Sequence, residues 1–344
     1  MATDIVLDVG TYKTTLFSGG KVVLEEPSVV AVDTNTWEPI AFGLEAKAMF
    51  GKTPDSISII FPIERGVVSD YDIAESMVVH FIKKIFGNRI VKPRVIVIVP
   101  SGVTTVQHHS LANAVAAAGC RNISTIDTTI ATAIGLGTNL DKPRGSMIID
   151  IGGGITNIST ISLGGIAQQD TLRVGSIDFD DDIEKYVRRE KNIYIGGQTA
   201  ERIKRVVGSA VKRDFNITIN AKGRHVFSGM PETFEISSDE VYDAIYDRLL
   251  LICKAAQAVL EKTDPDIVSD ISVDGIKLIG GGAAMYGMDK LLSQYLDVDV
   301  EYIDDPKRSP SAGAERVLKN PKILTLHDFK YRSIQNLIVD SESL

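Results

Sequence analysis

The sequence predicts an α/β fold with largely parallel sheets, built as two related halves. Three observations predict it. Short β-rich runs alternate with segments of helical periodicity, most of the strands stop at a glycine, and one order of strand, glycine hairpin and later small-residue turn occurs twice. The chain has 344 residues, which suggests two domains at about 150 residues each. We therefore predict a duplicated domain with a ligand cleft between its two copies.

Individual elements follow from the spacing of apolar residues. Short, β-rich apolar runs predict buried strands at 4–9, 95–99, 146–151 and 275–279. Apolar residues at helical spacing predict helices at 73–86, 107–118, 240–260 and 288–296. The sequence Ser-Ser-Asp-Glu at 237–240 resembles a capping box, which marks the start of the third helix.

Composition and charge exclude several classes of protein. Hydrophobic residues make up 44% and charged residues 24%, which is globular composition and excludes disorder, collagen and disulfide scaffolds. Cys120 and Cys253 stand far apart, which favours a reducing compartment and argues against a structural zinc site. A net charge of −8 argues against a dedicated nucleic-acid binder. The chain shows no signal-peptide pattern at its start, and its longest uncharged stretch, 151–169, is too polar to span a bilayer, so we expect a cytoplasmic protein.

Two hairpin tips carry the chemistry that suits a nucleotide. Residues 8–11 read Asp-Val-Gly-Thr, and residues 150–154 read Asp-Ile-Gly-Gly-Gly. Backbone N–H groups in such turns hold phosphate oxygens, because glycine lets a ligand approach closely. Asp8 and Asp150 would repel phosphate, but they suit hydrogen bonds to the waters around Mg²⁺. A third turn, Gly-Gly-Gly-Ala at 280–283, offers bare backbone against which a flat base can lie.

These segments resemble the two phosphate loops and the adenosine motif of the actin, heat-shock chaperone and sugar-kinase superfamily. Within it, the chain is similar to the MreB family of bacterial actin homologues over nearly its full length. The segments that carry this resemblance are Glu-Pro-Ser-Val-Val-Ala at 26–31, Ala-Lys at 46–47, Gly-Lys-Thr-Pro at 51–54, Pro-Ser-Gly-Val-Thr at 100–104, Ile-Ser-Leu-Gly-Gly-Ile at 161–166 and Thr-Ala-Glu-Arg-Ile-Lys at 199–204.

The resemblance implies an actin-like fold, in which two duplicated α/β domains form four subdomains around a nucleotide cleft. Domain I is expected at 1–141 plus 313–344, with its insertion at about 30–72. Domain II is expected at 142–312, with its insertion at about 179–240. The resemblance further implies ATP or ADP with Mg²⁺ in the cleft, and protofilaments that bind membrane.

The resemblance also assigns residues to the nucleotide. Glu201 and Lys204 are implied at its ribose and adenine end, although the two alone would be typical of an exposed helix pair. Asp8 and Asp150 are implied to hold Mg²⁺ through water. The implied contacts are Gly10, Thr11, Tyr12, Lys13, Gly152, Gly153, Gly154, Glu201, Arg202, Ile203, Lys204, Gly280, Gly281, Gly282 and Ala283.

Departures from the family pattern affect hydrolysis. Where the family usually has Glu-Glu-Pro, residues 127–129 read Asp-Thr-Thr, so Thr128 stands in place of the glutamate that orients the attacking water. Where it usually has Thr-Thr-Glu, residues 155–157 read Ile-Thr-Asn. A side chain that activates water is typically worth ~10²–10⁴-fold in rate, so we expect bound ATP to be hydrolysed slowly. The remaining catalytic candidates are Asp127, Thr128 and Thr156.

A basic and apolar segment at 83–94 suggests a membrane contact. Five basic residues flank its apolar side chains, and an inserted apolar side chain contributes about 1.5–3 kcal/mol. Phe86, Ile90 and Val91 are the expected contacts, which would place the protein at the inner face of the cell membrane. The alternative is a helix end whose Phe86 packs inward.

The expected partners are further copies of the chain in protofilaments, MreB-like paralogues and the membrane surface, with no nucleic acid. Two other functions stay open. A small-molecule kinase of the same superfamily would need a substrate pocket and a catalytic aspartate, and no candidate stands out. A nucleotide-gated scaffold that does not polymerise alone is the second alternative.

Overall fold

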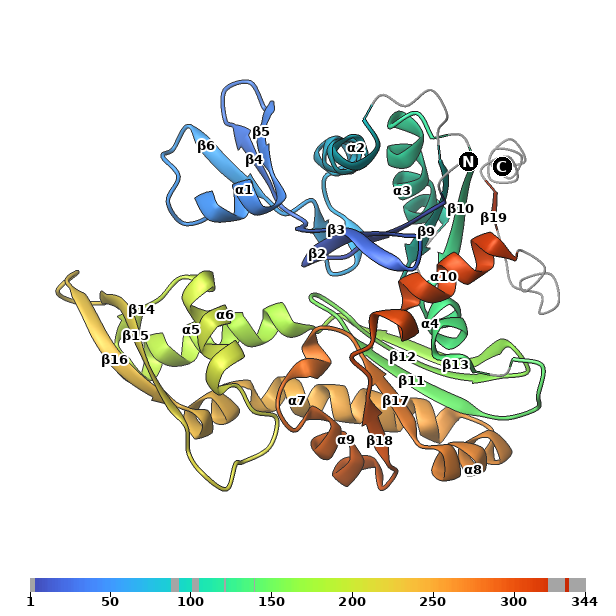
Figure 1. Ribbon diagram of the computed structural model, residues 1–344. Coiled ribbons are helices and arrows are strands. Elements are labelled where there is room, and N and C mark those ends of the chain that lie inside the picture. The colour runs from blue at the N-terminus through green and yellow to red at the C-terminus, as the bar shows by residue number, and fades with distance from the viewer. Residues whose placement is uncertain are drawn as a thin grey trace. The chain divides into compact units, whose positions relative to one another are not determined.

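The computed structural model describes residues 4–87, 93–100, 105–120, 122–138, 140–320 and 332–333. The chain divides into two compact units, in which strands and helices alternate (Figure 1). Unit 1 comprises 1–145, 161–169 and 304–344, and unit 2 comprises 146–160 and 170–303. The predicted α/β class is confirmed. No helix in the described ranges is long and apolar enough to cross a membrane.

The main sheet of unit 1 is formed, in spatial order, by β19 (Arg332–Ser333), β10 (Asn122–Asp127), β9 (Arg94–Val99), β1 (Ile5–Val9), β2 (Lys13–Ser18) and β3 (Lys21–Pro27). The three central strands, β10, β9 and β1, run parallel, and β2 pairs antiparallel with β1 to form the first hairpin. The predicted strands at 4–9 and 95–99 are thus confirmed. Strands β1 and β9 show no clear alternation of apolar and polar residues, because both of their faces are covered. Leu7 and Ile96 are fully buried.

Helices and two small sheets complete unit 1. Helix α2 (Tyr71–Phe86) follows the N-cap Asp70, whose side chain accepts from the N–H of Ile73, and its apolar face packs into the core. The remaining elements are α1 (Gly43–Met49), α3 (Thr105–Ala117), α4 (Thr128–Leu136), α10 (Pro310–Lys319), η2 (Pro306–Arg308), β4 (Val30–Asp33), β5 (Pro39–Phe42), β6 (Ile57–Ile60), β7 (Ile63–Glu64) and β8 (Val67–Val68).

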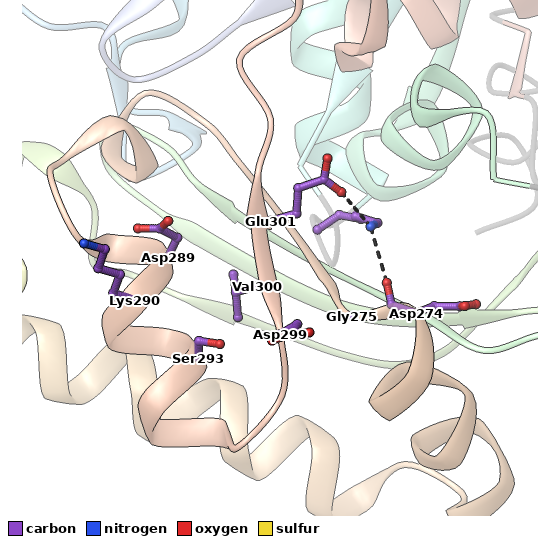
Figure 2. A pocket seen from close by; sticks show the side chains of 9 residues that line it. Asp274, Gly275, Asp289, Lys290, Ser293, Asp299, Val300 and Glu301 are labelled. Carbon is purple, nitrogen blue, oxygen red and sulfur yellow. Dashed lines mark hydrogen bonds and ion pairs between the residues drawn. The ribbon is translucent and has the colours of Figure 1, made fainter.

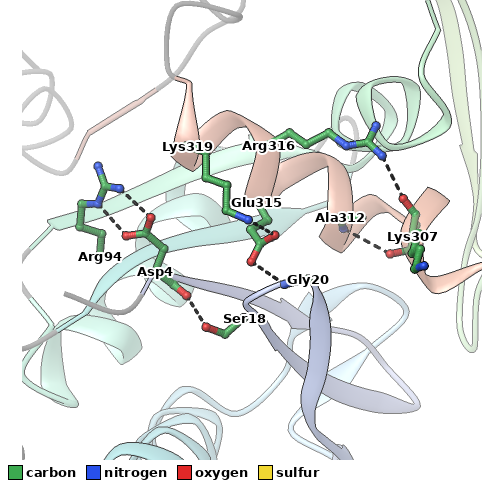
Figure 3. A network of polar contacts seen from close by, with 10 residues as sticks. Asp4, Ser18, Gly20, Arg94, Lys307, Ala312, Glu315, Arg316 and Lys319 are labelled. Atoms are coloured by element: carbon green, nitrogen blue, oxygen red, sulfur yellow. Dashed lines mark hydrogen bonds and ion pairs between the residues drawn. The ribbon is translucent and has the colours of Figure 1, made fainter. Parts of the chain in front are cut away.

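Helix α10, near the end of the described chain, contacts a turn near its beginning. The buried carboxylate of Glu315 accepts from the N–H of Gly20, in the turn between β2 and β3, at 3.0 Å (Figure 3). Arg316 donates to the carbonyl of Ile134 in α4 at 2.6 Å. A Cβ at Gly313 would overlap the α4 backbone, so the two helices pack at close range. Helix α10 therefore contacts both the β2–β3 turn and α4 within unit 1.

The second large sheet is formed, in spatial order, by β13 (Gly165–Leu172), β12 (Thr156–Ser162), β11 (Ser146–Ile151), β17 (Ile276–Ile279) and β18 (Val300–Tyr302). All of its residues belong to unit 2 except those of β12 and β13 that fall within 161–169. Strands β11, β17 and β18 run parallel, which confirms the predicted strands at 146–151 and 275–279. A smaller sheet contains β14 (Ile193–Tyr194), β15 (Thr218–His225) and β16 (Pro231–Ser237).

The helices of unit 2 are α5 (Ser176–Lys191), α6 (Gly197–Val207), α7 (Ser238–Lys262), α8 (Pro265–Asp274), η1 (Gly282–Ala284) and α9 (Met288–Leu296). The predicted capping box is confirmed at the start of α7. The Ser237 side chain accepts from the N–H of Glu240 at 3.3 Å, and the Glu240 carboxylate accepts from the N–H of Ser237 at 2.9 Å. The long α7 buries one face in the core and supports the main sheet.

Candidate functional site

The tips of the two glycine hairpins contain the same hydrogen bond at the same position. The N–H of Gly10 donates to the carbonyl of Lys13 at 3.0 Å, and the N–H of Gly152 donates to the carbonyl of Ile155 at 2.8 Å. A Cβ on either glycine would lie within about 3 Å of the accepting oxygen, so a larger residue would disturb both turns. The two tips are thus equivalent turns, in agreement with the repeat seen in the sequence.

Neighbouring segments of unit 1 hold the first tip in place. The hydroxyl of Thr11 accepts from the N–H of Gly66 at 2.9 Å. The hydroxyl of Tyr12 accepts from Lys47 Nζ at 2.8 Å, and that ammonium also lies 4.6 Å from the centre of the Tyr12 ring. These contacts fix the tip before any ligand binds. The side chain of Tyr12 is therefore engaged with α1 in this structure.

Asp8 and Lys13 place opposite charges beside the first tip. Asp8 is partly buried near the end of β1. Burial raises the pKa of Asp8 to about 6, and the positive charge of Lys13 opposes this rise. Lys13 Nζ forms an exposed ion pair with Glu25 at 2.6 Å, so its charge is shared with another carboxylate. Approach of Lys13 to a phosphate would require this surface pair to open.

Helix α5 holds the second tip by its first turn. The N–H groups of Ser176 and Ile177 donate to the carbonyls of Gly152 and Gly153, at 3.0 and 2.9 Å. The first N–H groups of a helix lack partners within the helix, and here the tip supplies them. A Cβ at Gly175 would overlap the backbone of this tip, so glycine is required where the chain passes it.

The third turn packs directly on the second tip. Gly280 has a φ of +96°, and a Cβ there would overlap both the Asp150 side chain and the Ile151 carbonyl. A Cβ at Gly282 would overlap the side chain of Ile151. By contrast, the direction of a Cβ at Gly281 is open space. A planar base has room against the backbone at Gly281, next to the end of the strand that carries Asp150.

Helix α6 is amphipathic, with one apolar face in the core and polar side chains outside that face. Lys204 Nζ donates to Asp180 Oδ2 at 2.7 Å and to the carbonyl of Ser176 at 2.6 Å. The Glu201 carboxylate lies 3.8 Å from Arg205 Nη1 on the next turn of the helix. Lys204 is thus engaged within unit 2, and Glu201 is mostly buried beside it.

The side chains of three residues expected to contact the nucleotide pack in the core or bond to a strand. Ile203 has no exposed surface and belongs to the core of unit 2, and Ala283 is buried in the same core. Arg202 Nη2 donates to the carbonyl of Asn220 in β15 at 3.0 Å. These observations argue against side-chain contacts from Ile203 and Ala283. Burial of Ile203 follows from its place on the apolar face of α6, with Ala200 and Val207.

Asp127 and Thr128 lie at the start of α4, where each already has a hydrogen bond. Asp127 is the N-cap residue, and its Oδ1 accepts from the N–H of Thr129 at 2.7 Å. Thr128 is 9% exposed, and its hydroxyl donates to the carbonyl of Val99 at 2.9 Å. Because its proton is already donated, the Thr128 oxygen can accept a hydrogen bond from water but cannot act as a base.

The surroundings of Thr156 do not suit the catalytic role predicted for it. Its side chain has no exposed surface, and its hydroxyl donates to the carbonyl of Val174 at 2.8 Å. Its neighbour Ile155 is apolar and 9% exposed. This geometry argues against catalysis by Thr156, because its hydroxyl is used to join β12 to the segment before α5.

The family model described as MreB/Mbl protein matches residues 2–325 of this chain. The chain belongs to the MreB/Mbl family. It is 37% identical to the cell shape-determining protein MreB of Escherichia coli (strain K12), over 92% of this chain and 94% of that protein. It is 36% identical to the cell shape-determining protein Mbl of Bacillus subtilis (strain 168), over 93% of this chain and 96% of that protein.

Solved structures confirm the actin-like fold of this MreB/Mbl-family chain. MreB5 of Spiroplasma citri bound to ADP aligns with a TM-score of 0.88 and 32% identity, over 94% of this chain and 98% of that one. The same protein bound to AMPPNP aligns with a TM-score of 0.86 and 33% identity, over 94% and 97% of the two chains. A MamK double helical filament shares the fold, with a TM-score of 0.76 and 19% identity over 93% and 99%.

For Phe86, the structure of this MreB/Mbl-family chain favours the alternative left open by the sequence, in which the side chain packs inward. Phe86 is 8% exposed at the end of α2 and packs into the core of unit 1. Its spacing from Val78 and Ile82 places it on the buried face of the helix. Ile90 and Val91, the other two expected contacts, lie outside the described residues.

A shallow pocket of about 390 Å³ in unit 2 lies away from the expected site residues (Figure 2). It is lined by α9, the end of α8 and the edge strand β18, and none of the residues expected to bind nucleotide lines it. At its side, Lys277 Nζ pairs with the Glu301 carboxylate at 2.8 Å. Its mixed charge and exposed position identify it as a surface feature separate from the hairpin tips.

Within the described ranges, no group of three or more His, Cys, Asp or Glu side chains is arranged to hold a metal ion. Magnesium commonly keeps several waters and is held by one or two carboxylates together with phosphate oxygens. Asp8, near the end of β1 in unit 1, and Asp150, near the end of β11 in unit 2, are each a carboxylate of the kind that accepts hydrogen bonds from magnesium-bound water.

Sequence reasoning missed Asp180 and Ser176, which contact Lys204. Asp180 is one of four aspartates between 178 and 182, and nothing in the spacing marks it as the buried partner of a lysine. The weak signal was its place one residue after the buried Phe179, near the start of a helix that directly follows Gly175.

Proposed function

We propose that this MreB/Mbl-family chain binds ATP or ADP with Mg²⁺ through its glycine hairpin tips and its third turn, and that it polymerises into filaments. The observation that carries the proposal is the matched pair of turns at Gly10 and Gly152. Backbone turns of this kind offer N–H groups to phosphate oxygens. The structures of MreB5 bound to ADP and AMPPNP support the choice of ligand, and the MamK filament supports self-association.

The two ends of the nucleotide call for different features of unit 2. The second tip presents backbone groups to phosphate. The first turn of α5, which is bonded to this tip, adds the positive end of a helix dipole beside it. The third turn offers open space at Gly281 for the base, and Glu201 can accept hydrogen bonds from ribose hydroxyls. Magnesium, when bound, neutralises part of the phosphate charge, and Asp8 and Asp150 would orient its waters.

We further propose that hydrolysis in this chain is slow. The position that would activate water holds Thr128, whose hydroxyl proton is donated to Val99. Ile155, after the second tip, can neither accept nor donate a hydrogen bond through its side chain. Asp127 carries a carboxylate, but that group caps α4. A filament subunit with these residues would keep ATP for a long time.

We also propose a location at the inner face of the cell membrane, and an assembly with further copies or MreB-like paralogues. Support comes from the basic and apolar composition of 83–94 and from the cell shape-determining relatives. Lys84 contributes less charge than its place suggests, because its Nζ pairs with the buried carboxylate of Glu26 at 2.7 Å. Ile90 and Val91 are the apolar residues left for this contact.

The test of the main proposal is a titration of the purified chain with ADP and with ATP in the presence and absence of Mg²⁺, paired with sedimentation of the same samples. We expect saturable binding that Mg²⁺ strengthens, and a pellet that grows when ATP is added. Gly152→Val, which crowds the second tip, should remove both signals while leaving the circular dichroism spectrum unchanged. Equal binding by this variant would contradict the proposed site.

A further inference from the structure

The two hairpin tips differ in the side chains that they carry. Residues 10–13 read Gly-Thr-Tyr-Lys, and the equivalent residues 152–155 read Gly-Gly-Gly-Ile. Tyr12 therefore stands where the second tip has Gly154. Glycine in such a turn leaves the backbone open to a ligand, so a tyrosine at the same position calls for a separate explanation. Its ring is partly buried, and its hydroxyl is bonded to α1.

Tyr12 is anchored at two points. Its carbonyl accepts from the N–H of Ser28 at 3.1 Å, and its hydroxyl accepts from Lys47 Nζ at 2.8 Å. The same ammonium lies 4.6 Å from the centre of the tyrosine ring, which adds a cation–π attraction. A residue that is held both at its carbonyl and at the end of its side chain has little rotational freedom left. The direction of its own N–H, which faces the turn, is therefore fixed as well.

The two tips are also held by different kinds of bond. The second tip accepts backbone N–H groups from the first turn of α5. In the first tip, side chains take part: the hydroxyl of Thr11 accepts from the N–H of Gly66, and that of Tyr12 accepts from Lys47. A backbone bond survives replacement of a side chain, whereas the bond from Lys47 is lost with a single substitution. The geometry of the first tip thus depends on a residue outside it.

The start of α1 holds Lys47 in place. The buried carboxylate of Glu26 accepts from the N–H of Leu44, in the first turn of α1, at 2.8 Å. The same carboxylate accepts from Lys84 of α2 at 2.7 Å. Gly43 has a φ of +59°, and a Cβ there would overlap the Glu26 side chain, so the helix begins in close contact with it. Helix α1 is therefore a fixed support from which Lys47 reaches the tip.

We propose that Lys47 is a positioning residue for the first phosphate tip, which it holds through the Tyr12 hydroxyl and not by contact with the nucleotide. The inference rests on the proposed nucleotide function. It assigns part of the phosphate affinity to α1, a helix that contains none of the residues expected to bind the nucleotide. Removal of the Lys47–Tyr12 bond then weakens binding of the phosphates and leaves binding of the base and ribose as it was.

The test compares ADP with adenosine, which lacks the phosphates, by displacement of a fluorescent ADP analogue below the polymerising concentration. Lys47→Met removes the ammonium while keeping the length of the side chain. We expect the Kd for ADP to rise roughly tenfold, as for loss of a hydrogen bond from a charged donor, and the Kd for adenosine to change by less than about twofold. Lys47→Arg keeps the charge and the donors and should lose less ADP affinity than Lys47→Met.

A double-variant cycle tests whether Lys47 acts through the hydroxyl. Tyr12→Phe removes the hydroxyl but keeps the ring, and it should weaken ADP binding about as much as Lys47→Met. The two changes together should weaken it no further, because both remove one bond. Losses that add up in the double variant would overturn the inference, since the two residues would then act separately.

Lys52→Met is the matched control, because it removes one positive charge from an exposed position three residues after the end of α1. It should bind ADP and adenosine as the wild type does. Unchanged ADP binding by Lys47→Met or by Tyr12→Phe would overturn the inference. Equal weakening of ADP and adenosine would overturn it too, since partial unfolding acts on both ligands. A wild-type chain that binds no ADP would instead refute the proposed function.

Discussion

The hydroxyl of Thr128, the first residue of α4, donates to the carbonyl of Val99, the last residue of β9, at 2.9 Å. This bond joins the start of α4 to the end of β9 and uses the only proton that the side chain can donate. The residue that stands where the family usually has a water-orienting glutamate is therefore a structural link between a helix and a strand.

Replacement of this link by a base should accelerate hydrolysis. In the double variant Thr128→Glu plus Ile155→Thr, we expect phosphate release under polymerising conditions to rise by ~10²-fold or more, because a carboxylate can activate water. Release of inorganic phosphate over time is the measurement. Thr128→Gln plus Ile155→Thr has nearly the same shape without a base and should stay at the wild-type rate. A wild type already as fast as the glutamate variant would show that another group, such as Asp127, activates the water.

Two adjacent glycines of the third turn should respond differently to one added methyl group. Gly280→Ala should lower the melting temperature, because a Cβ at φ +96° would overlap Asp150 and Ile151. Gly281→Ala meets open space and should leave the melting temperature unchanged, but it should weaken adenosine binding by filling the space proposed for the base. Thermal unfolding and adenosine titration measure the two effects. If Gly281→Ala binds adenosine as the wild type does, the base lies elsewhere.

Glu26 makes stability depend on pH through its contacts with α1 and α2. Burial pushes the pKa of Glu26 up, but hydrogen bonds from Lys84 and the N–H of Leu44 outweigh it and hold the pKa below the ordinary value of 4.5. The ionised carboxylate therefore contributes stability that is present above pH 4.5 and is lost as the pH falls through its lowered pKa.

The change that tests this contribution is Glu26→Gln, followed by urea unfolding at several pH values. The variant should be less stable than the wild type at neutral pH by about 1–3 kcal/mol, and the difference should shrink in acid. Glu25→Gln is the matched control, because its ion pair with Lys13 is half exposed and contributes little. A gap between Glu26→Gln and the wild type that is constant with pH would contradict the assignment.

Membrane binding, if it uses 88–92, should not depend on Phe86. We expect Ile90→Ser plus Val91→Ser to reduce cosedimentation with anionic phosphatidylglycerol vesicles, because each lost apolar side chain removes about 1.5–3 kcal/mol of insertion energy. Val206→Ser, at an exposed apolar position of α6, should bind vesicles as the wild type does. Phe86→Leu, which changes a core side chain, should alter the melting temperature and not the vesicle binding. Full vesicle binding by the double variant would refute the contact.

The strands and long helices could be predicted because their apolar residues follow a clear pattern, whereas α4 could not. All but its last residue are buried, from Thr128 to Gly135, so no polar face marks the helical period. The hairpin tips were predictable, because glycine is needed at Gly10 and Gly152 for a reason that local sequence carries. The partners of Lys204 were not, since Asp180 is distant in sequence and resembles its acidic neighbours.

The side chains of Phe86 and Ile203 are buried, and the sequence already carried a signal for this. Both occupy helical positions in register with other buried residues, Phe86 with Ile82 and Ile203 with Ala200. Membrane and nucleotide contacts were expected there from the composition of the segment and from the family motif. Periodicity decides which side of a helix a residue occupies, and in both cases it favoured the core.

The bond between Glu315 and Gly20 spans 295 positions of the chain. A ribosome delivers residues in order, and the last stretch of unit 1 begins at Asp304, after every residue of unit 2. Unit 2 is nearly continuous and can fold while synthesis proceeds, but the first strands of unit 1 must wait for α10 to emerge. Nascent chains halted before Asp304 would therefore hold a half-covered first sheet, and this interval is when a chaperone would protect them.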